Sequence, residues 1–208
     1  MDIDHRFRDK LCIVTGAGGF IGSHLCKRLC LAGAVVQGWR RDTVDLRDCG
    51  AVTKLLREVQ PNYVFHLAAV GIAHNQSNNS TVVGENGQMV SHLIDGLSSV
   101  GAGSCRFVVA GSMSEYGASD TPLKENMLCA PTTAYGIAKL ASSLFAISQG
   151  QRAGITTTVA RIFGAYGTGE RAERLFPTLM RDLRSRNSVE LSDGRQVRDF
   201  IHVSDVCE

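Results

Sequence analysis

The 208-residue sequence has little proline, little excess charge of either sign and no long apolar run. Four Pro beside 22 Gly and 44% hydrophobic residues describe a compact globular chain, which excludes collagen and a disordered tail. Lys and Arg number 22 against 20 Asp and Glu, a formal net charge of +2. So small a charge, spread along the chain, excludes the dense phosphate-binding surface of a nucleic-acid-binding protein.

A membrane span is also missing, because no stretch approaches the roughly 18 consecutive apolar residues that a span needs. The N-terminal residues Asp2, Asp4 and Arg6 carry charge where a signal peptide is apolar. We therefore expect a cytoplasmic protein without a membrane partner.

The seven cysteines form no CxxC pair, and several of them, such as Cys12, lie inside apolar segments. We expect reduced thiols. No cluster of His and Cys has the spacing of zinc ligands, so the sequence predicts no metal site.

Short apolar runs alternate with amphipathic segments along the chain. Residues 11–15, 35–39, 63–67, 107–110 and 156–162 are continuously apolar, which predicts strands buried on both faces. Residues 21–32, 51–59, 86–100 and 134–149 have helical length and apolar spacing. This alternation predicts an α/β fold, a Rossmann-like doubly wound parallel sheet. The irregular stretch 71–84 is expected to be a surface loop near the strand ends.

The predicted fold divides the chain into two parts. Residues 1–165 are expected to form the domain that contains the sheet, and residues 166–208 a partial second region. The chain stops soon after the strand-like residues 200–203, with no closing element behind them. The C-terminal region is therefore expected to be truncated.

A glycine-rich turn joins the first predicted strand to the first helix. Gly16 makes the tight turn, Gly19 lets the backbone approach a pyrophosphate, and Gly22 lets the helix pack close to the strand. Phe20 and Ile21 begin the helix, whose free amide groups hold the phosphate charge. A flexible loop is the alternative, but the position between a buried strand and a helix favours dinucleotide binding.

The choice of cofactor is predicted from the end of the second strand. Arg40 and Arg41 stand where NAD-binding domains carry a carboxylate for the ribose. Guanidinium groups can bond a 2′-phosphate and stack on adenine, so NADP(H) is favoured, with NAD(H) as the alternative. Two merely solvated arginines would explain the pair as well. Asp45 and Leu46 suit the adenine edge, although a surface turn fits them nearly as well.

Tyr135 and Lys139 stand four residues apart in a predicted helix, so both side chains lie on one face, one turn apart. We expect the Lys139 ammonium to lower the pKa of Tyr135, because a nearby positive charge favours phenolate, and so to permit proton transfer near neutral pH. Ser112 ends a parallel strand, where such sheets carry their sites, and its hydroxyl could hold a reacting oxygen. A chance Tyr and Lys at helical spacing is the alternative.

In order and spacing, these segments resemble the extended short-chain dehydrogenase/reductases, in the branch of nucleotide-sugar epimerases, dehydratases and 4-ketoreductases. The resemblance covers nearly the whole chain. It is carried by the glycine motif of residues 16–22, His66-Leu67-Ala68-Ala69, Asn86, the run Gly-Ser-Met-Ser-Glu-Tyr-Gly at 111–117, Tyr135-xxx-Lys139, Arg161-Ile162-Phe163, and Arg-Asp-Phe-Ile-His-Val at 198–203.

The resemblance implies a role for each catalytic residue. Tyr135 would be the acid/base on the sugar's hydroxyl or keto oxygen, Lys139 would also hold the nicotinamide ribose, and Ser112 would orient the substrate oxygen. The remaining contacts implied are Leu67, Ala68 and Ala69 with the cofactor, Met113 and Ser114 with the substrate, and Arg198 with the nucleotide-sugar diphosphate.

The resemblance also narrows the reaction. Dehydratases of this branch carry an acidic pair directly after the catalytic Ser or Thr, and Met113 and Ser114 stand there instead, so dehydration is not expected. The arginine pair, and the likeness of residues 111–117 to 4-reductases of GDP-6-deoxyhexoses, favour NADPH-dependent 4-keto reduction. An NAD-dependent 4-epimerase of the UDP-sugar type is the first alternative.

Two departures weaken the resemblance. Gly164 stands where the family carries an Asn that bonds the substrate, and family members are longer, their C-terminal part closing over the sugar nucleotide. The resemblance implies that residues 1–165 are the NAD(P)-binding domain and residues 166–208 a partial substrate-binding region. A non-catalytic dinucleotide-binding or truncated protein is therefore the second alternative. The family further implies a homodimer through helices beside the sheet, including the one predicted at 134–149.

Overall fold

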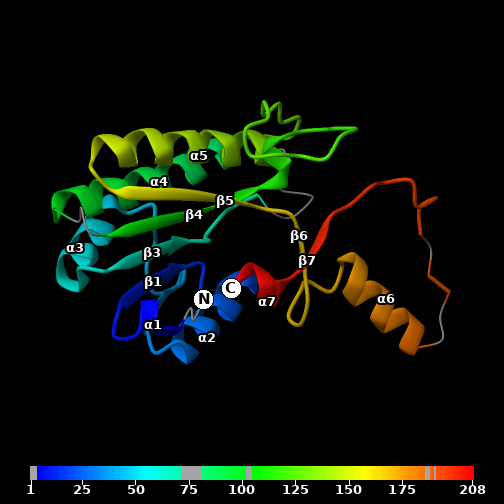
Figure 1. Cartoon of the computed structure of the whole chain (residues 1–208), viewed down its shortest axis with the longest axis horizontal. Helices are drawn as coiled ribbons and strands as arrows, with labels where there is room; N and C mark the ends of the chain where they lie inside the picture. Colours follow the sequence, from blue (N-terminus) through cyan, green and yellow to red (C-terminus); the bar gives the residue numbers. More distant parts are fainter. Residues whose placement is uncertain (1–3, 72–80, 102–104, 186–187, 190) are drawn as a thin grey trace.

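The computed structural model describes residues 4–71, 81–101, 105–185, 188–189 and 191–208 (Figure 1). Its centre is a five-stranded parallel sheet in the order β2-β1-β3-β4-β5. The strands are β1 (Leu11–Thr15), β2 (Val35–Trp39), β3 (Tyr63–His66), β4 (Arg106–Ser112) and β5 (Thr156–Ile162). The predicted Rossmann-like α/β fold is confirmed, with β4 longer than expected and β3 one residue shorter.

The order of the strands decides where a ligand can bind. β2 lies on one side of β1 and β3 on the other, so the connections that follow β1 and β3 diverge. Open parallel sheets bind their ligands in the crevice outside the carboxyl ends of the strands at such a point.

Helices cover the two faces of the sheet unequally (Figure 1). α3 (Cys49–Val59), α4 (Thr81–Ser99) and α5 (Ala134–Arg152) lie on one face, and α1 (Asp4–Phe7) and α2 (Phe20–Leu31) lie on the other. The larger hydrophobic core fills the space under the three helices, where Leu56, Leu93 and Leu97 pack around Phe107. These side chains are fully buried and bring about 2 kcal/mol each of hydrophobic stabilisation.

α4 begins within the stretch that the sequence predicts to be a loop. Residues 72–80 lie outside the described part of the chain, but residues 81–84 form the first turn of the helix, which corrects that prediction. The buried Val82 belongs to the same helical stripe as Asn86, Met89 and Leu93. The neighbouring polar residues and Gly84 concealed this start in the sequence.

A second, two-stranded parallel sheet pairs β6 (Gly164–Tyr166) with β7 (Phe200–His202) beyond the end of β5 (Figure 1). The domain boundary expected after residue 165 falls within β6. α6 (Leu175–Arg184) lies between these strands in sequence, and the short helix α7 (Val203–Val206) follows β7 directly. Val203, predicted to be strand-like, instead starts a helical turn capped by the side chain of His202.

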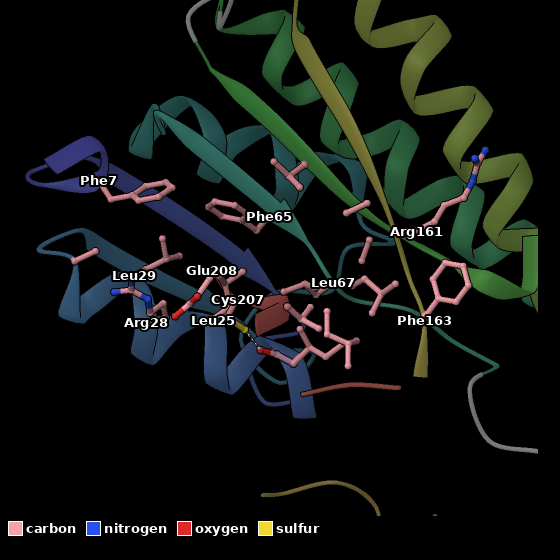
Figure 2. A pocket seen from close by; sticks show the side chains of 18 of the residues that line it. Phe7, Leu25, Arg28, Leu29, Phe65, Leu67, Arg161, Phe163, Cys207 and Glu208 are labelled. Carbon is pink, nitrogen blue, oxygen red and sulfur yellow. Dashed lines mark hydrogen bonds between the residues drawn. The ribbon is translucent and has the colours of Figure 1, made fainter. Parts of the chain in front are cut away.

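The face of the sheet beside α2 holds an apolar groove of about 410 Å³ (Figure 2). Leu25 and Leu29 of α2 line it opposite Phe65, and Cys207 and Glu208 lie within it. Parallel sheets are usually covered on both faces, whereas in the described chain no helix covers this face of β4 and β5.

Candidate functional site

The loop between β1 and α2 has the shape that a dinucleotide phosphate needs. Gly16 has a φ of 70°, and a Cβ there would lie 2.8 Å from the backbone nitrogen of Ala68. A Cβ at Gly22 would collide with the carbonyl oxygen of Gly16, so only glycine lets α2 pack this close. α2 starts after Gly19 with no side-chain cap, which leaves amide donors for an anion. These residues therefore fit a bound dinucleotide.

A cleft of about 1660 Å³ runs along the carboxyl ends of the strands. It exceeds the roughly 300–1,000 Å³ of a usual small-molecule pocket, so it has room for a dinucleotide and a second ligand. Most of the site residues predicted from the sequence line it: Gly16, Gly19, Phe20, Ile21, Gly22, Leu67, Ala69, Ser112, Met113, Ser114, Tyr135, Lys139 and Arg198.

Ser112, Tyr135 and Lys139 all line this cleft. Ser112 is the last residue of β4, and its side chain lies close enough to the Tyr135 phenol to lower the pKa of that phenol. Tyr135 and Lys139 lie one turn apart at the start of α5, which Thr133 caps by accepting a 3.0 Å hydrogen bond from the Gly136 N–H. The strand end and the helix start thus bring a hydroxyl, a phenol and an amine to the lining of one cleft.

Burial controls the ionisation of these groups. Desolvation raises the pKa of Tyr135; the hydrogen bond with Ser112 and the Arg174 charge oppose the rise, and the Glu115 carboxylate adds to it. Desolvation likewise lowers the pKa of Lys139 to about 8, against the opposing effect of Glu115. The expected lowering of the Tyr135 pKa is therefore wrong, because burial of the phenol outweighs its charged neighbours. Protonated at neutral pH, Tyr135 is suited to donate a proton to a keto oxygen.

His66 ends β3 beside this site but does not line the cleft. Its Nδ1 lies 2.8 Å from the Thr15 hydroxyl, which also accepts a hydrogen bond from the Ala68 N–H. Burial, with a smaller effect of the Lys139 charge, lowers the pKa of His66 to about 3. A neutral imidazole therefore ties β1 to β3 at the point where the sheet reverses its winding, which is a packing role.

The predicted specificity residues lie outside the cleft lining. Arg40 packs its aliphatic part over the glycine loop, 3.5 Å from the position of a Cβ on Gly18, and Arg41 is exposed. The Asp45 carboxylate is held by both Nε and NH2 of Arg47, at 2.9 and 2.7 Å, and that pairing lowers the pKa of Asp45. Leu46 is buried in the core. Only Arg40 thus lies against the dinucleotide loop.

Two groups of residues at or beside the cleft were missed by the sequence reasoning. Glu170, Arg171, Glu173 and Arg174 precede α6 and line the cleft, and their charged run was the available signal. Glu115 is completely buried and pairs with Arg161, whose Nε donates to its carboxylate at 2.8 Å. No local pattern marks this pair, because the two residues are 46 positions apart.

Two further expectations concern metals and membranes. In the described part of the chain, no group of three or more His, Cys, Asp or Glu could hold a metal ion, and the seven cysteines are free. Among the described residues, no helix has both the length and the apolar character to cross a membrane.

Comparison with known proteins agrees with this geometry. YtcB of Bacillus subtilis (strain 168), described as an uncharacterized UDP-glucose epimerase, is 27% identical over 93% of this chain and 69% of its own length. The GDP-6-deoxy-D-talose 4-dehydrogenase of Aggregatibacter actinomycetemcomitans is 29% identical over 94% of this chain and 67% of its own. The chain thus spans about two thirds of the length of these relatives.

Solved structures are similar to this chain in fold as well as in sequence. The structure of MoeE5 in complex with UDP-glucuronic acid and NAD is 32% identical to this chain, with a TM-score of 0.78, and the match covers 94% of this chain and 69% of that one. The model of the NAD dependent epimerase/dehydratase family matches residues 12–208. The predicted resemblance to extended nucleotide-sugar enzymes is confirmed, and the chain belongs to the NAD dependent epimerase/dehydratase family.

Proposed function

We propose that this chain is the core of a nucleotide-sugar oxidoreductase that reduces the 4-keto group of a nucleotide-linked 6-deoxyhexose, with NADPH as the preferred cofactor and a GDP sugar as the substrate type. The observation that carries the proposal is the meeting of Ser112, Tyr135 and Lys139 in a cleft that also contains the glycine loop. The likeness to a GDP-6-deoxy-D-talose 4-dehydrogenase supports it, since 4-dehydrogenation and 4-keto reduction are the same step in opposite directions.

The side chains of the site have separate roles in this reduction. The nicotinamide, when bound, supplies the hydride that adds to C4 of the sugar. Ser112 holds the keto oxygen, and Tyr135 gives its phenolic proton to that oxygen as the C4–H bond forms. Lys139, with a pKa of about 8, holds positive charge beside the phenolate that remains until a solvent proton replaces the one donated. Met113 and Ser114 offer no acid or base to expel a hydroxyl, which excludes dehydration by the family's acidic pair.

Turnover of 4-keto nucleotide sugars by a Tyr135→Phe variant tests this assignment. We expect the oxidation of NADPH to fall by at least about 10²-fold, because general acid catalysis contributes roughly 10²–10⁴-fold. Dinucleotide affinity should stay within twofold, followed by quenching of Trp39, whose carbonyl oxygen accepts the Ala17 N–H of the glycine loop. Tyr63→Phe, on β3 against Phe7, is the control and should be fully active. Full activity of Tyr135→Phe would refute the proposal.

The cofactor preference is tested by a matched pair of arginine variants. Arg40 lies over the glycine loop and Arg41 does not, so Arg40→Ala should weaken NADPH binding about tenfold and leave NADH binding nearly unchanged. Arg41→Ala should have a smaller effect on both. Equal affinities of the parent chain for NADPH and NADH would contradict the proposed preference for NADP(H).

A second candidate is an NAD-dependent 4-epimerase acting on a UDP sugar. The observation in its favour is the 32% identity to MoeE5, whose structure holds UDP-glucuronic acid and NAD. An epimerase oxidises and reduces the same carbon, so it would turn over a 4-hydroxy sugar without net consumption of cofactor. NAD retained through purification, with epimer formation and no absorbance change, would select it. Tight dinucleotide binding with neither activity would select a non-catalytic dinucleotide-binding protein.

A further inference from the structure

A buried carboxylate stands behind the proposed catalytic serine. Glu115 is the last residue of η1 (Met113–Glu115), the single 3-10 turn after β4, and it is 0% exposed. Glu115 does not line the cleft. Its side chain turns back toward the strand and receives donors from three separate elements.

We propose that Glu115 is a positioning residue, which fixes Ser112 at the end of β4 so that its hydroxyl faces Tyr135. The proposal rests on the assignment of Ser112 and Tyr135 to the reacting oxygen. Glu115 Oε1 accepts the backbone N–H of Ser112 at 2.8 Å, while the Ser112 hydroxyl accepts the N–H of Ser114 at 3.1 Å. This reciprocal pair is a capping box, and it defines both the backbone and the hydroxyl of Ser112.

The carboxylate is itself held from two other directions. The Ser143 hydroxyl of α5 donates to Oε1 at 3.0 Å, and Arg161 Nε of β5 donates to Oε2 at 2.8 Å. Ser143 belongs to the same helix as Tyr135, so the carboxylate connects the end of β4 directly to the helix of the phenol. A one-ångström displacement of a reacting group can cost about 10²-fold in rate, which makes such a connection consequential.

The strand provides the space for this carboxylate. Gly111 lies in β4 directly before Ser112, and a Cβ at that position would approach Glu115 Oε1 to 2.6 Å. A residue with a side chain at this position would therefore push the carboxylate out of its place. The position of the Glu115 carboxylate therefore depends on glycine at residue 111.

Arg161 extends the arrangement to the loop beyond η1. Its guanidinium donates to the Tyr116 hydroxyl and to the Glu125 carbonyl oxygen, both at 3.1 Å, and lies 4.8 Å from the centre of the Tyr116 ring. Figure 2 shows the side chain pointing away from the apolar groove, toward α5. Arg161 thus neutralises the buried carboxylate and anchors the segment that follows the Ser112 turn.

Glu115→Gln and Glu115→Leu separate positioning from charge. Both variants remove the carboxylate and leave Arg161 without its ion pair, but only Gln keeps an oxygen that can accept the Ser112 N–H. With a 4-keto nucleotide sugar and NADPH, we expect kcat to fall about 10²-fold in Glu115→Leu and less than tenfold in Glu115→Gln, with NADPH affinity within twofold in both. Leu97→Ala, a cavity in the distant core, controls for destabilisation and should keep kcat unchanged at a temperature where it is folded.

A second measurement does not depend on turnover. The ionisation of Tyr135 is followed by phenolate absorbance, as the difference between each variant and the same variant with Tyr135→Phe. The Ser112 hydrogen bond lowers the pKa of Tyr135, and the charges facing the phenol are those of Glu115, Arg174 and Lys139, the last one helical turn away on α5. Arg174 and Lys139 are unchanged in both variants, so a displaced Ser112 should leave the Tyr135 pKa higher in Glu115→Leu than in Glu115→Gln.

Equal Tyr135 pKa values in the two variants would overturn the positioning role, whether or not the parent chain is active. If the values differ but no 4-keto sugar is reduced, the positioning role stands and the proposed function fails. Should Glu115→Leu not fold, Gly111→Ala provides the same test, because its Cβ displaces the carboxylate without removing its charge. A Tyr135 pKa in Gly111→Ala that matches the parent chain would equally overturn the role.

Discussion

Replacing Lys139 with methionine should stabilise the fold at neutral pH while removing a group that the proposed chemistry needs. Lys139 is 5% exposed, and burial lowers its pKa from 10.5 to about 8. At pH 7 the amine is protonated in both the folded and the unfolded chain, so the folded state carries the full cost of burying an ammonium group. Methionine has a similar length and no charge to desolvate.

The size of the effect follows from the pKa shift. A shift from 10.5 to about 8 corresponds to on the order of 3 kcal/mol of free energy of unfolding. Because the folded-state pKa is the lower one, the cost of burying the ammonium group is complete below pH 8. Between pH 8 and 10.5 the unfolded chain still binds the proton and the folded chain does not, so this cost is relieved as the pH rises. The advantage of Lys139→Met should therefore be largest near pH 7 and nearly gone at pH 10.

Urea unfolding followed by the fluorescence of Trp39 measures this advantage, because Trp39 is buried in the core. Lys54→Met is the matched control, since Lys54 is exposed on α3 and the same chemical change there relieves no burial. The free energy of unfolding of Lys139→Met is compared with that of the parent chain at pH 7 and again at pH 9.5. The buried thiols titrate equally in both proteins, so their effect cancels in this difference. A Lys139→Met variant that is no more stable than the parent at pH 7, or equally advantaged at both pH values, would refute the reasoning.

Three further outcomes are expected from the same geometry. The pKa of His66 is lowered to about 3, so its neutral form stabilises the fold above pH 6.5, and this contribution is lost as the pH falls. Between pH 7 and pH 4.5, the free energy of unfolding in urea should fall by on the order of 3 kcal/mol more for the parent than for His66→Gln. Equal losses in the two proteins would contradict the assignment. Gly22→Ala should abolish dinucleotide-dependent quenching of Trp39, because its Cβ meets the Gly16 carbonyl oxygen, whereas Gly87→Ala, with open space around it, should bind normally. The proposed homodimer should be weakened in sedimentation by Leu144→Glu on α5, at a side chain 59% exposed, and not by Leu183→Glu on α6, 65% exposed; a parent chain that sediments as a monomer would exclude the dimer.

Local interactions explain what the sequence by itself determined. The glycine spacing after β1 limits the backbone to a turn that only residues without side chains allow, and the four-residue interval from Tyr135 to Lys139 is a property of any helix. Short apolar runs separated by helical segments indicate parallel strands, which is why all five strands of the main sheet were predicted. The predicted burial on both faces is wrong for β4 and β5, because no helix in the described chain covers their second face. These features depend on residues a few positions apart, so the sequence displays them directly.

The tertiary structure alone decided the electrostatics of the site. Glu115 and Arg161 lie 46 positions apart and meet only because β4 and β5 are neighbours in the sheet. The raised pKa of Tyr135 and the lowered pKa of Lys139 come from the desolvation imposed by the whole assembled cleft, which no local pattern reports. The same holds for the two arginines after β2: they are adjacent in sequence, but it is Arg40 that lies against the glycine loop, because β2 pairs with β1 and so ends beside that loop.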